Sequence, residues 1–459
     1  MATPGHIVNQ TSETAQWTLD ISSYFGRFDP MYTFNKKALS RKSEITKIIK
    51  GDCSLKFGIN EEFPGVLDSY HGDPSFHMQD ESKRAVTRAM EDIQEDRMWK
   101  FVESDGSYYA RANPKILREL AAEKLFHILD HPHPQVPGIK VPPSDVLVYP
   151  YSDTCVIEKV LASVSKSKGV ILSPAGFYKN NSKLAFNAGL KIVAIPIDLQ
   201  TGKMDFDEMD RLLQLYTHQG TLCCFLMTIP GNPLVVEYTV EELQRIGCAV
   251  LKYQVPTVVD SIFFSSAPAD KAIQLAAVEV EFEGKTVLMH DHVVTTSGNS
   301  KGPRASGPSK IGALCTGNGV WREKLALLMS CPVIQRETTH IARATLEFCT
   351  LEFYDRCCEN MMAQQVKARK LIADLNEKYG ERSISVVGPS TYSMFMAIAL
   401  SDDLCKKAGI VDSWQLEDFF LAVGGLDSVS FAFFGCDDVF AIRLNTLCPE
   451  RNGYKKEEN

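Results

Sequence analysis

The sequence predicts an α/β protein in which a large domain, built on a mostly parallel sheet, is joined to a smaller α+β domain. A chain of 459 residues is too long for one ordinary hydrophobic core. Its middle part alternates short β-rich runs with helical stretches, which is the pattern of a doubly wound sheet. Several of these runs are apolar at almost every position, as in strands that are buried on both faces.

The expected strands of the large sheet follow one another through the middle of the chain. They are residues 146–151, 170–174, 191–197, 222–229, 257–264, 286–295 and 311–316. Two of the helices between them have clear local signals. Residues 154–165 have an apolar stripe, and residues 238–253 begin with Thr239 and Glu242, which have the spacing of a capping box.

The two ends of the chain differ from this middle part. Residues 1–50 are polar and irregular, which is typical of an arm, and residues 75–130 have a largely helical pattern. The tail is expected to contain a helix at 337–379, a strand at 385–400, a helix at 412–423 and strands at 431–434 and 439–447. The predicted domains are 1–105 for the arm and part of the small domain, 106–330 for the large domain and 331–459 for the rest of the small domain.

Composition excludes several classes of protein. A net charge of −8 argues against nucleic acid as the main partner. We expect no membrane segment, because no apolar run is long enough to span a bilayer, and no signal peptide, because the N-terminus lacks a basic start and an apolar core. The 13 cysteines are scattered, which fits free thiols in a cytoplasmic protein. His290-Asp291-His292 has no further obvious ligand, so no metal site is expected.

One candidate for chemistry is a Ser-Lys pair in a Gly/Ser-rich turn, Ser297-Gly298-Asn299-Ser300-Lys301. An amine presented in this way can react with an aldehyde. The pair alone is a weak signal, because a lysine in a polar loop usually faces solvent. Ser309-Lys310 repeats the same dipeptide nine positions later and remains a competitor.

Three other motifs precede this turn in the order Ser152-Asp153-Thr154, Asn232-Pro233 and Asp260. The first follows an apolar strand and opens a helix, where hydroxyls and free backbone N–H groups bind a phosphate or simply cap the helix. Asp260 ends an apolar run, where a carboxylate needs a partner. Gly-Asn-Pro is also ordinary turn chemistry.

In this order, the motifs resemble those of the class I/II aminotransferase family of pyridoxal-phosphate (PLP) enzymes, from about residue 57 to about residue 447. The resemblance implies the type I PLP-dependent transferase fold, with PLP as cofactor and an α-amino acid as substrate. It also implies a homodimer with the active site at the subunit interface.

The resemblance also implies a role for each candidate residue. It makes Lys301, which is followed by the basic element Lys310-Ile311-Gly312, the lysine that carries the cofactor as a Schiff base. The other roles are Ser152, Asp153, Thr154 and Lys310 for the cofactor phosphate, Asn232 for the ring 3-oxygen, Asp260 for the pyridine nitrogen, Tyr178 for stacking on the ring, Arg443 for the substrate α-carboxylate, and Tyr108 for the phosphate across the dimer.

Two of these assignments keep an alternative. Phe177 competes with Tyr178 for the stacking position, and Tyr109 competes with Tyr108. The segments Phe57-Gly58-Ile59-Asn60 and Gly72-Asp73-Pro74 resemble the family's substrate-side loop.

The sequence departs from the family pattern at three positions. Phe263 replaces a common Tyr that hydrogen-bonds the cofactor oxygen, and Lys310 replaces an Arg after a loop that is one residue longer. Gly298 replaces a phosphate-binding Ser, for which Ser297 is a substitute. These departures count against simple amino transfer. Because most members of the resembled family transfer amino groups, amino transfer is still the first expectation, a PLP lyase, synthase or cyclase is the second, and an inactive binding relative is the third.

Overall fold

The computed structural model describes most of the chain. The described residues are 7–8, 18–19, 40–45, 67–70, 78–94, 113–130, 136, 138–263, 273–307, 309–379, 383–389, 391–436 and 439–447. Their helices are α2 (Asp80–Gln94), α4 (Lys115–Leu120), α5 (Asp153–Val164), α6 (Asn180–Asn187), α7 (Phe206–His218), α8 (Val240–Tyr253), α9 (Gly319–Leu328), α10 (Arg336–Glu347), α11 (Leu351–Tyr379), α12 (Asp402–Lys407) and α13 (Ser413–Gly424). None of the helices in these ranges has the length and apolarity needed to cross a membrane.

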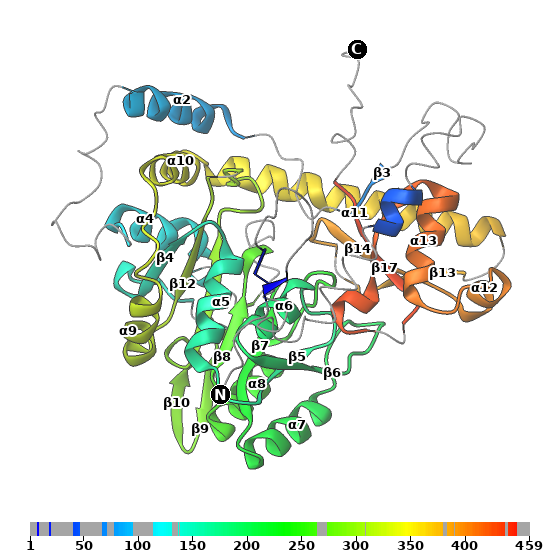
Figure 1. The fold of residues 1–459 in the computed structure, drawn as a ribbon, viewed down its shortest axis with the longest axis horizontal. Helices are drawn as coiled ribbons and strands as arrows, with labels where there is room; N and C mark the ends of the chain where they lie inside the picture. Colours follow the sequence, from blue (N-terminus) through cyan, green and yellow to red (C-terminus); the bar gives the residue numbers. More distant parts are fainter. Residues whose placement is uncertain are drawn as a thin grey trace.

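A seven-stranded sheet forms the centre of the larger part of the molecule (Figure 1). Its strands are β4 (Val146–Pro150), β5 (Gly169–Pro174), β6 (Leu190–Ile195), β7 (Leu222–Thr228), β8 (Thr257–Asp260), β11 (Val293–Gly298) and β12 (Ile311–Cys315). The spatial order is β4-β12-β11-β8-β7-β5-β6, and β12 alone runs antiparallel to its neighbours within it. The predicted α/β class with a large, mostly parallel sheet is therefore confirmed.

Both faces of this sheet are covered, which explains its continuous apolar runs. In β4, Val146 and Val148 belong to the core cluster on one face, whereas Leu147 and Tyr149 belong to the cluster on the other face. The capping box predicted for α8 is confirmed, because Glu242 N donates to the Thr239 hydroxyl and Thr239 N donates to the Glu242 carboxylate.

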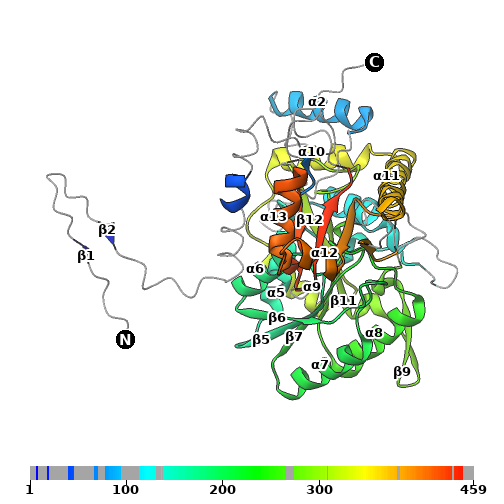
Figure 2. The same ribbon diagram turned by 90° about the vertical axis from the view of Figure 1, so that its right-hand side faces the viewer.

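A smaller antiparallel sheet lies beside the large one, as the orange and red strands of Figure 1 show. Its strands are β13 (Ile384–Val387), β14 (Phe395–Leu400), β16 (Val429–Ser430) and β17 (Ala441–Asn445), in the order β13-β14-β17-β16. An early segment joins this region, because β3 (Leu67–Asp68) pairs in parallel with β15 (Leu426–Asp427). Helix α2 packs against α10 (Figure 2).

Four expected elements differ from the structure. The run at 286–295 is broken, because β10 (Lys285–Leu288) forms a hairpin with β9 (Glu279–Phe282) and a helical turn precedes β11. The expected helix at 337–379 is two helices, and the hydroxyl of Thr350 accepts from Phe353 N at the start of the second. Two other expectations are also wrong: 385–400 is a pair of strands, β13 and β14, and 431–434 is a 3-10 helix.

The short strands β1 (Ile7–Val8) and β2 (Thr18–Leu19) pair with each other. Tyr108, Tyr109, the Phe57–Asn60 segment and Gly72-Asp73-Pro74 lie outside the described residues.

Candidate active site

The predicted site residues converge at one edge of the large sheet. The parallel strands β4, β8 and β11 end there, and the antiparallel β12 begins there. In such sheets, ligands bind at the carboxyl ends of the strands. A cavity of about 280 Å³ opens at this edge, and its lining includes nine of the ten predicted site residues. The lining residues are Tyr70, Ser152, Asp153, Thr154, Ile157, Tyr178, Lys179, Asn232, Asp260, Ile262, Phe263, Ser300, Lys301, Lys310 and Arg443.

The N-terminus of α5 forms one wall of this cavity. Ser152 occupies the N-cap position but makes no side-chain capping hydrogen bond, so the simple cap considered from the sequence is not seen. The first backbone N–H groups of a helix have no partner within the helix and attract anions. The buried hydroxyl of Ser300 also has no hydrogen-bond partner within the described part of the chain. These donors, with the cation of Lys310, suit a phosphate.

A close approach of β12 to α5 completes that wall. A Cβ atom at Gly312 would lie 2.5 Å from the Ser152 carbonyl oxygen, so only glycine fits there. Gly312 therefore allows Lys310, two positions earlier, to lie beside the helix N-terminus. Ser297 is part of β11 and is absent from the described cavity lining, so Ser300 is the hydroxyl that lies in place of the expected one.

Asn299 positions the loop that carries both lysines. Its side-chain oxygen accepts from Ile311 N at 2.7 Å, and its amide donates to the Ser306 hydroxyl at 2.9 Å. These bonds close the loop on itself, so Lys301 and Lys310 both face the cavity. Arg304, three positions after Lys301, donates to the Lys124 carbonyl and lies over the Tyr354 ring.

Asp260 lies at the end of β8, at the floor of the cavity. Only 2% of the residue is exposed, and one carboxylate oxygen accepts from Ile262 N at 3.1 Å. No cation forms an ion pair with it among the residues described, so its charge is available to a positively charged ring nitrogen. Burial raises the pKa of Asp260, whereas the hydrogen bond from Asp153 and the one from Ile262 N lower it.

Asp153 directs its side chain to Asp260, whereas its backbone lies at the start of α5. Burial raises the pKa of Asp153 well above its usual value, and the charge of Asp260 and the hydrogen bond between the two carboxyl groups raise it further. Asp153 therefore keeps its proton and donates to Asp260, because two buried carboxylates in contact cannot both ionise easily. Only the backbone of Asp153 is then suited to the phosphate role.

We predict that Asp153→Asn stabilises the cofactor-free protein at neutral pH. The folded-state pKa of Asp153 is raised, so the folded state binds its proton more tightly than the unfolded state does. In the natural protein, this tighter proton binding stabilises the folded state fully below the unfolded-state pKa. The stabilisation is lost as the pH rises toward the folded-state pKa. An asparagine side chain keeps a hydrogen-bond donor but has no proton to lose in this pH range. In urea unfolding at several pH values, the free energy of unfolding of the variant should exceed that of the natural protein at pH 7, and this difference should vanish near pH 4. An equal free energy of unfolding at pH 7 would contradict the assignment.

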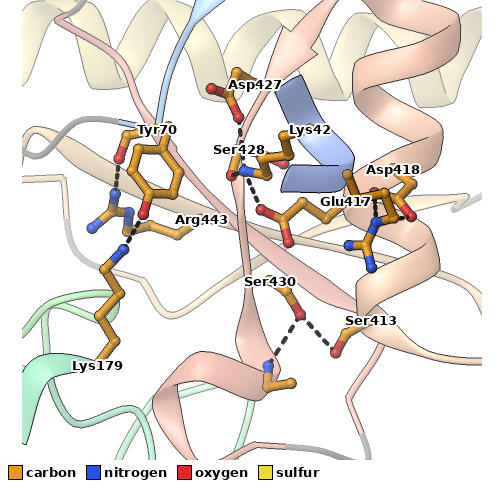
Figure 3. A network of polar contacts seen from close by, with 12 residues as sticks. Lys42, Tyr70, Lys179, Ser413, Glu417, Asp418, Asp427, Ser428, Ser430 and Arg443 are labelled. Atoms are coloured by element: carbon orange, nitrogen blue, oxygen red, sulfur yellow. Dashed lines mark hydrogen bonds and ion pairs between the residues drawn. The ribbon is translucent and has the colours of Figure 1, made fainter. Parts of the chain in front are cut away.

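Asn232 connects two parts of the site. Its side-chain oxygen accepts from Arg443 Nη1 at 2.9 Å, which leaves its amide hydrogens as donors. Arg443, on β17, is 2% exposed and lies over the Phe395 ring at 4.4 Å. Its other terminal nitrogen donates to the Tyr70 carbonyl (Figure 3). The guanidinium is therefore held rigidly at the cavity, as a carboxylate clamp requires.

Two aromatic residues have different environments. Tyr178 lines the cavity and its hydroxyl accepts from the Asn180 amide at 2.7 Å. Phe177 instead packs so closely on Gly435 that a Cβ atom there would lie 2.7 Å from its ring. Of the two candidates for stacking, the structure therefore brings Tyr178 to the site. Phe263 also lines the cavity and packs edge-to-face on Phe395, with ring centroids 5.1 Å apart.

The sequence reasoning missed Tyr70, Lys179, Asn299 and Ser300. Lys179 directly follows Tyr178, and Ser300 directly precedes Lys301, so adjacency to a candidate was the available signal. The histidine segment is not on a strand as expected: His290 lies in a helical turn and pairs with Asp145 at 3.3 Å. Within the described ranges, no cluster of three metal-ligating side chains occurs.

The fold and this arrangement of side chains define a PLP-dependent enzyme. The model of the family described as aminotransferase class I and II matches residues 77–415. The chain therefore belongs to the class I and II aminotransferase family. It is a PLP-dependent enzyme of the aminotransferase type, acting on an amino acid, and PLP is its cofactor.

Solved structures similar to this chain share its fold at low sequence identity. One is an aromatic aminotransferase from Pyrococcus horikoshii OT3, with 16% identity, coverage of 88% of this chain and 94% of that chain, and a TM-score of 0.64. Another is an aspartate aminotransferase from Thermus thermophilus with maleate, with 15% identity, coverage of 93% and 94%, and a TM-score of 0.66. A third is an aspartate aminotransferase from Thermotoga maritima, with 14% identity, coverage of 93% and 94%, and a TM-score of 0.65. A search of curated protein sequences found no significant match.

Proposed function

We propose that the cavity transfers the amino group of an α-amino acid to PLP and from there to a keto acid, with Lys301 as the catalytic amine. The observation that carries this proposal is the convergence of Lys301, Asp260, Asn232 and Arg443 at one edge of the sheet. PLP supplies an aldehyde that binds amines and a ring that withdraws electrons from the substrate α-carbon. The described residues supply a partner for each polar part of this molecule.

The proposed roles follow from the position of each residue. Arg443 binds the α-carboxylate, because its planar fork is fixed by Asn232 and Tyr70 at the cavity wall. Lys301 moves the proton at the α-carbon, since it extends from a loop whose two ends are fastened by Asn299. Asp260 holds a proton on the ring nitrogen.

The remaining roles concern the 3-oxygen, the ring face and the phosphate of the cofactor. Asn232, whose oxygen is bound to Arg443, donates to the ring 3-oxygen. Tyr178 covers one face of the ring. The N-terminus of α5 binds the phosphate with the help of Ser300 and Lys310, because each of these groups lines the cavity and offers positive charge or a hydrogen-bond donor.

Assembly and location also belong to the proposal. We expect a homodimer, as in the resembled family, in which Tyr108 reaches the cofactor phosphate of the other subunit. We expect the protein in the cytoplasm, since all 11 cysteines within the described ranges are free thiols.

The test is a screen in which the holoenzyme is mixed with single amino acids while cofactor absorbance and keto-acid release are followed. Amino transfer predicts stoichiometric conversion of the cofactor to its pyridoxamine form, with one keto acid released per site. Release of ammonia or a side-chain fragment with the cofactor unchanged would identify a lyase or cyclase instead. No spectral change with any amino acid would favour an inactive binding protein.

The aromatic ring of Phe263 gives a second test of reaction type. It places no hydroxyl near the ring 3-oxygen, so Asn232 is the main donor proposed there. We predict that Phe263→Tyr leaves the rate of pyridoxamine formation unchanged or raises it up to about tenfold, the scale of one added hydrogen bond of about 1.4 kcal/mol. Single-turnover absorbance measurements decide this. A slower main reaction accompanied by new pyridoxamine formation would indicate that elimination or cyclisation is the native reaction.

A further inference from the structure

A second cation faces the cavity near Arg443. Lys179 lies at the N-terminus of α6, and its amine donates to the Tyr70 hydroxyl. Figure 3 shows the amine of Lys179 pointing toward that hydroxyl, while the guanidinium of Arg443 lies beside the Tyr70 carbonyl. Tyr70 therefore bridges two cations, one at the start of α6 and the other on β17.

The charge of Lys179 is not neutralised by a direct ion pair. No carboxylate forms one with it in the part of the chain that the structure describes. Two acidic side chains of this region, Glu417 and Asp427, are bound by Lys42 instead (Figure 3). A largely buried ammonium without a counter-ion is costly. Burial and, after it, the charges of Arg443 and Lys42 lower the pKa of Lys179 to about 8, although Glu417 and Asp427 oppose this shift.

Aromatic faces compensate for part of this cost. The Lys179 amine lies 4.2 Å from the ring centroid of Tyr70 and 5.4 Å from that of Phe433. Such contacts favour a cation but leave its remaining N–H donors without a strong acceptor. An amine held this way, at the wall of a substrate cavity, is prepared to bind an anion.

We propose that Lys179 binds a second anionic group of the substrate, so that the preferred substrates are α-amino acids with an acidic side chain. The inference rests on the proposed function, in which Arg443 takes the α-carboxylate. Both cations line one cavity and are joined through one tyrosine, so a single substrate can reach both. A lysine suits a carboxylate whose position varies, because its charge is concentrated on a flexible stem.

The test compares two unreactive acids of equal length, succinate and butyrate, by calorimetric titration of the holoenzyme. Lys179→Met should weaken succinate binding at least tenfold and change butyrate binding less than twofold, whereas Lys179→Arg should retain the preference for succinate. Butyrate binding shows that the variant is folded. Lys191→Met, which removes an exposed lysine from β6, is the matched control and should change neither affinity.

The pH dependence gives an independent readout. Free Lys179 loses its charge as the pH rises through about 8. The titratable and charged groups that face it are Arg443, Lys42, Glu417, Asp427 and Tyr70. Succinate affinity should therefore fall above pH 8 in the natural protein but not in Lys179→Arg.

Two outcomes would overturn the proposal. An equal loss of succinate and butyrate affinity in Lys179→Met would place Lys179 in the α-carboxylate clamp, and no loss of either would exclude it from binding. These titrations need no turnover, so they are readable even if amino transfer itself is not observed. If amino transfer is observed, kcat/KM for aspartate or glutamate should fall at least tenfold in Lys179→Met, while that for alanine stays within twofold.

Discussion

Replacing Lys301 with alanine is expected to lower turnover at least about 1,000-fold while the protein stays folded. Lys301 is the proposed group that moves a proton at the α-carbon, and a positioned acid–base group contributes roughly 100- to 10,000-fold. Losing the covalent attachment to the cofactor adds to this effect. The measurement is kcat at saturating cofactor, together with the addition of a small primary amine such as methylamine. Partial recovery of turnover by that amine is expected, because it restores a proton carrier in the space left by the side chain.

Lys310 gives the matched comparison for this experiment. It lies at the other end of the same loop, beside the N-terminus of α5. Lys310→Ala should weaken cofactor binding and leave turnover at saturating PLP within about tenfold of the natural rate. The reverse pattern, with Lys310→Ala inactive and Lys301→Ala nearly normal, would exchange the roles of the two lysines.

The second large effect is expected for Asp260→Ala. The variant should still bind PLP, because the phosphate and ring contacts remain, but turnover should fall at least about 100-fold. The hydrogen bond between a carboxylate and a protonated ring nitrogen is worth roughly 1.5–3 kcal/mol. Its contribution grows where negative charge develops on the ring during the reaction, and one such preorganised group is commonly worth 100- to 1,000-fold.

The measurement for Asp260 is the rate of the first half-reaction by stopped-flow absorbance, with cofactor content checked separately. Asp260→Glu is the control, since it retains the charge and changes only its position, and it should recover part of the rate. Asp153→Asn should have a small effect on this rate, because the asparagine amide still donates to Asp260. A natural rate in Asp260→Ala would exclude Asp260 as the partner of the ring nitrogen.

The large sheet was predictable because burial of both of its faces restricts which residues its strands can contain. Strands with both faces buried are largely apolar, and β4, β5, β7 and β12 are, apart from Ser173 and Thr228 near the ends of β5 and β7. The same rule failed at residues 286–295, where a hairpin strand and a sheet strand are both β-rich and only the turn at Met289–Asp291 separates them. The single strand expected at 385–400 also joined β13 and β14, although Gly388-Pro389, a turn signal, lies between them.

The site was predictable where sequence order implies a shared sheet edge. Asp260 ends one strand of the large sheet, and Ser152 and Lys301 each follow another, so their meeting follows from topology. The meeting of Lys179 with Tyr70 does not, because the two residues are 109 positions apart and their contact depends on the pairing of β3 with β15. The orientation of the Asp153 side chain toward Asp260 could not be predicted either, since an aspartate at a helix start is an ordinary capping residue.

The most direct test of the whole account is to reduce the holoenzyme with borohydride and to map the labelled peptide by mass spectrometry. The account predicts a single pyridoxyl group on Lys301, in the peptide that contains Asn299 and Ser300. Labelling of Lys310 would contradict the assignment of the catalytic amine and would also displace the phosphate contacts. Absence of any label in a protein that binds PLP would contradict the claim that this cavity attaches the cofactor through a lysine.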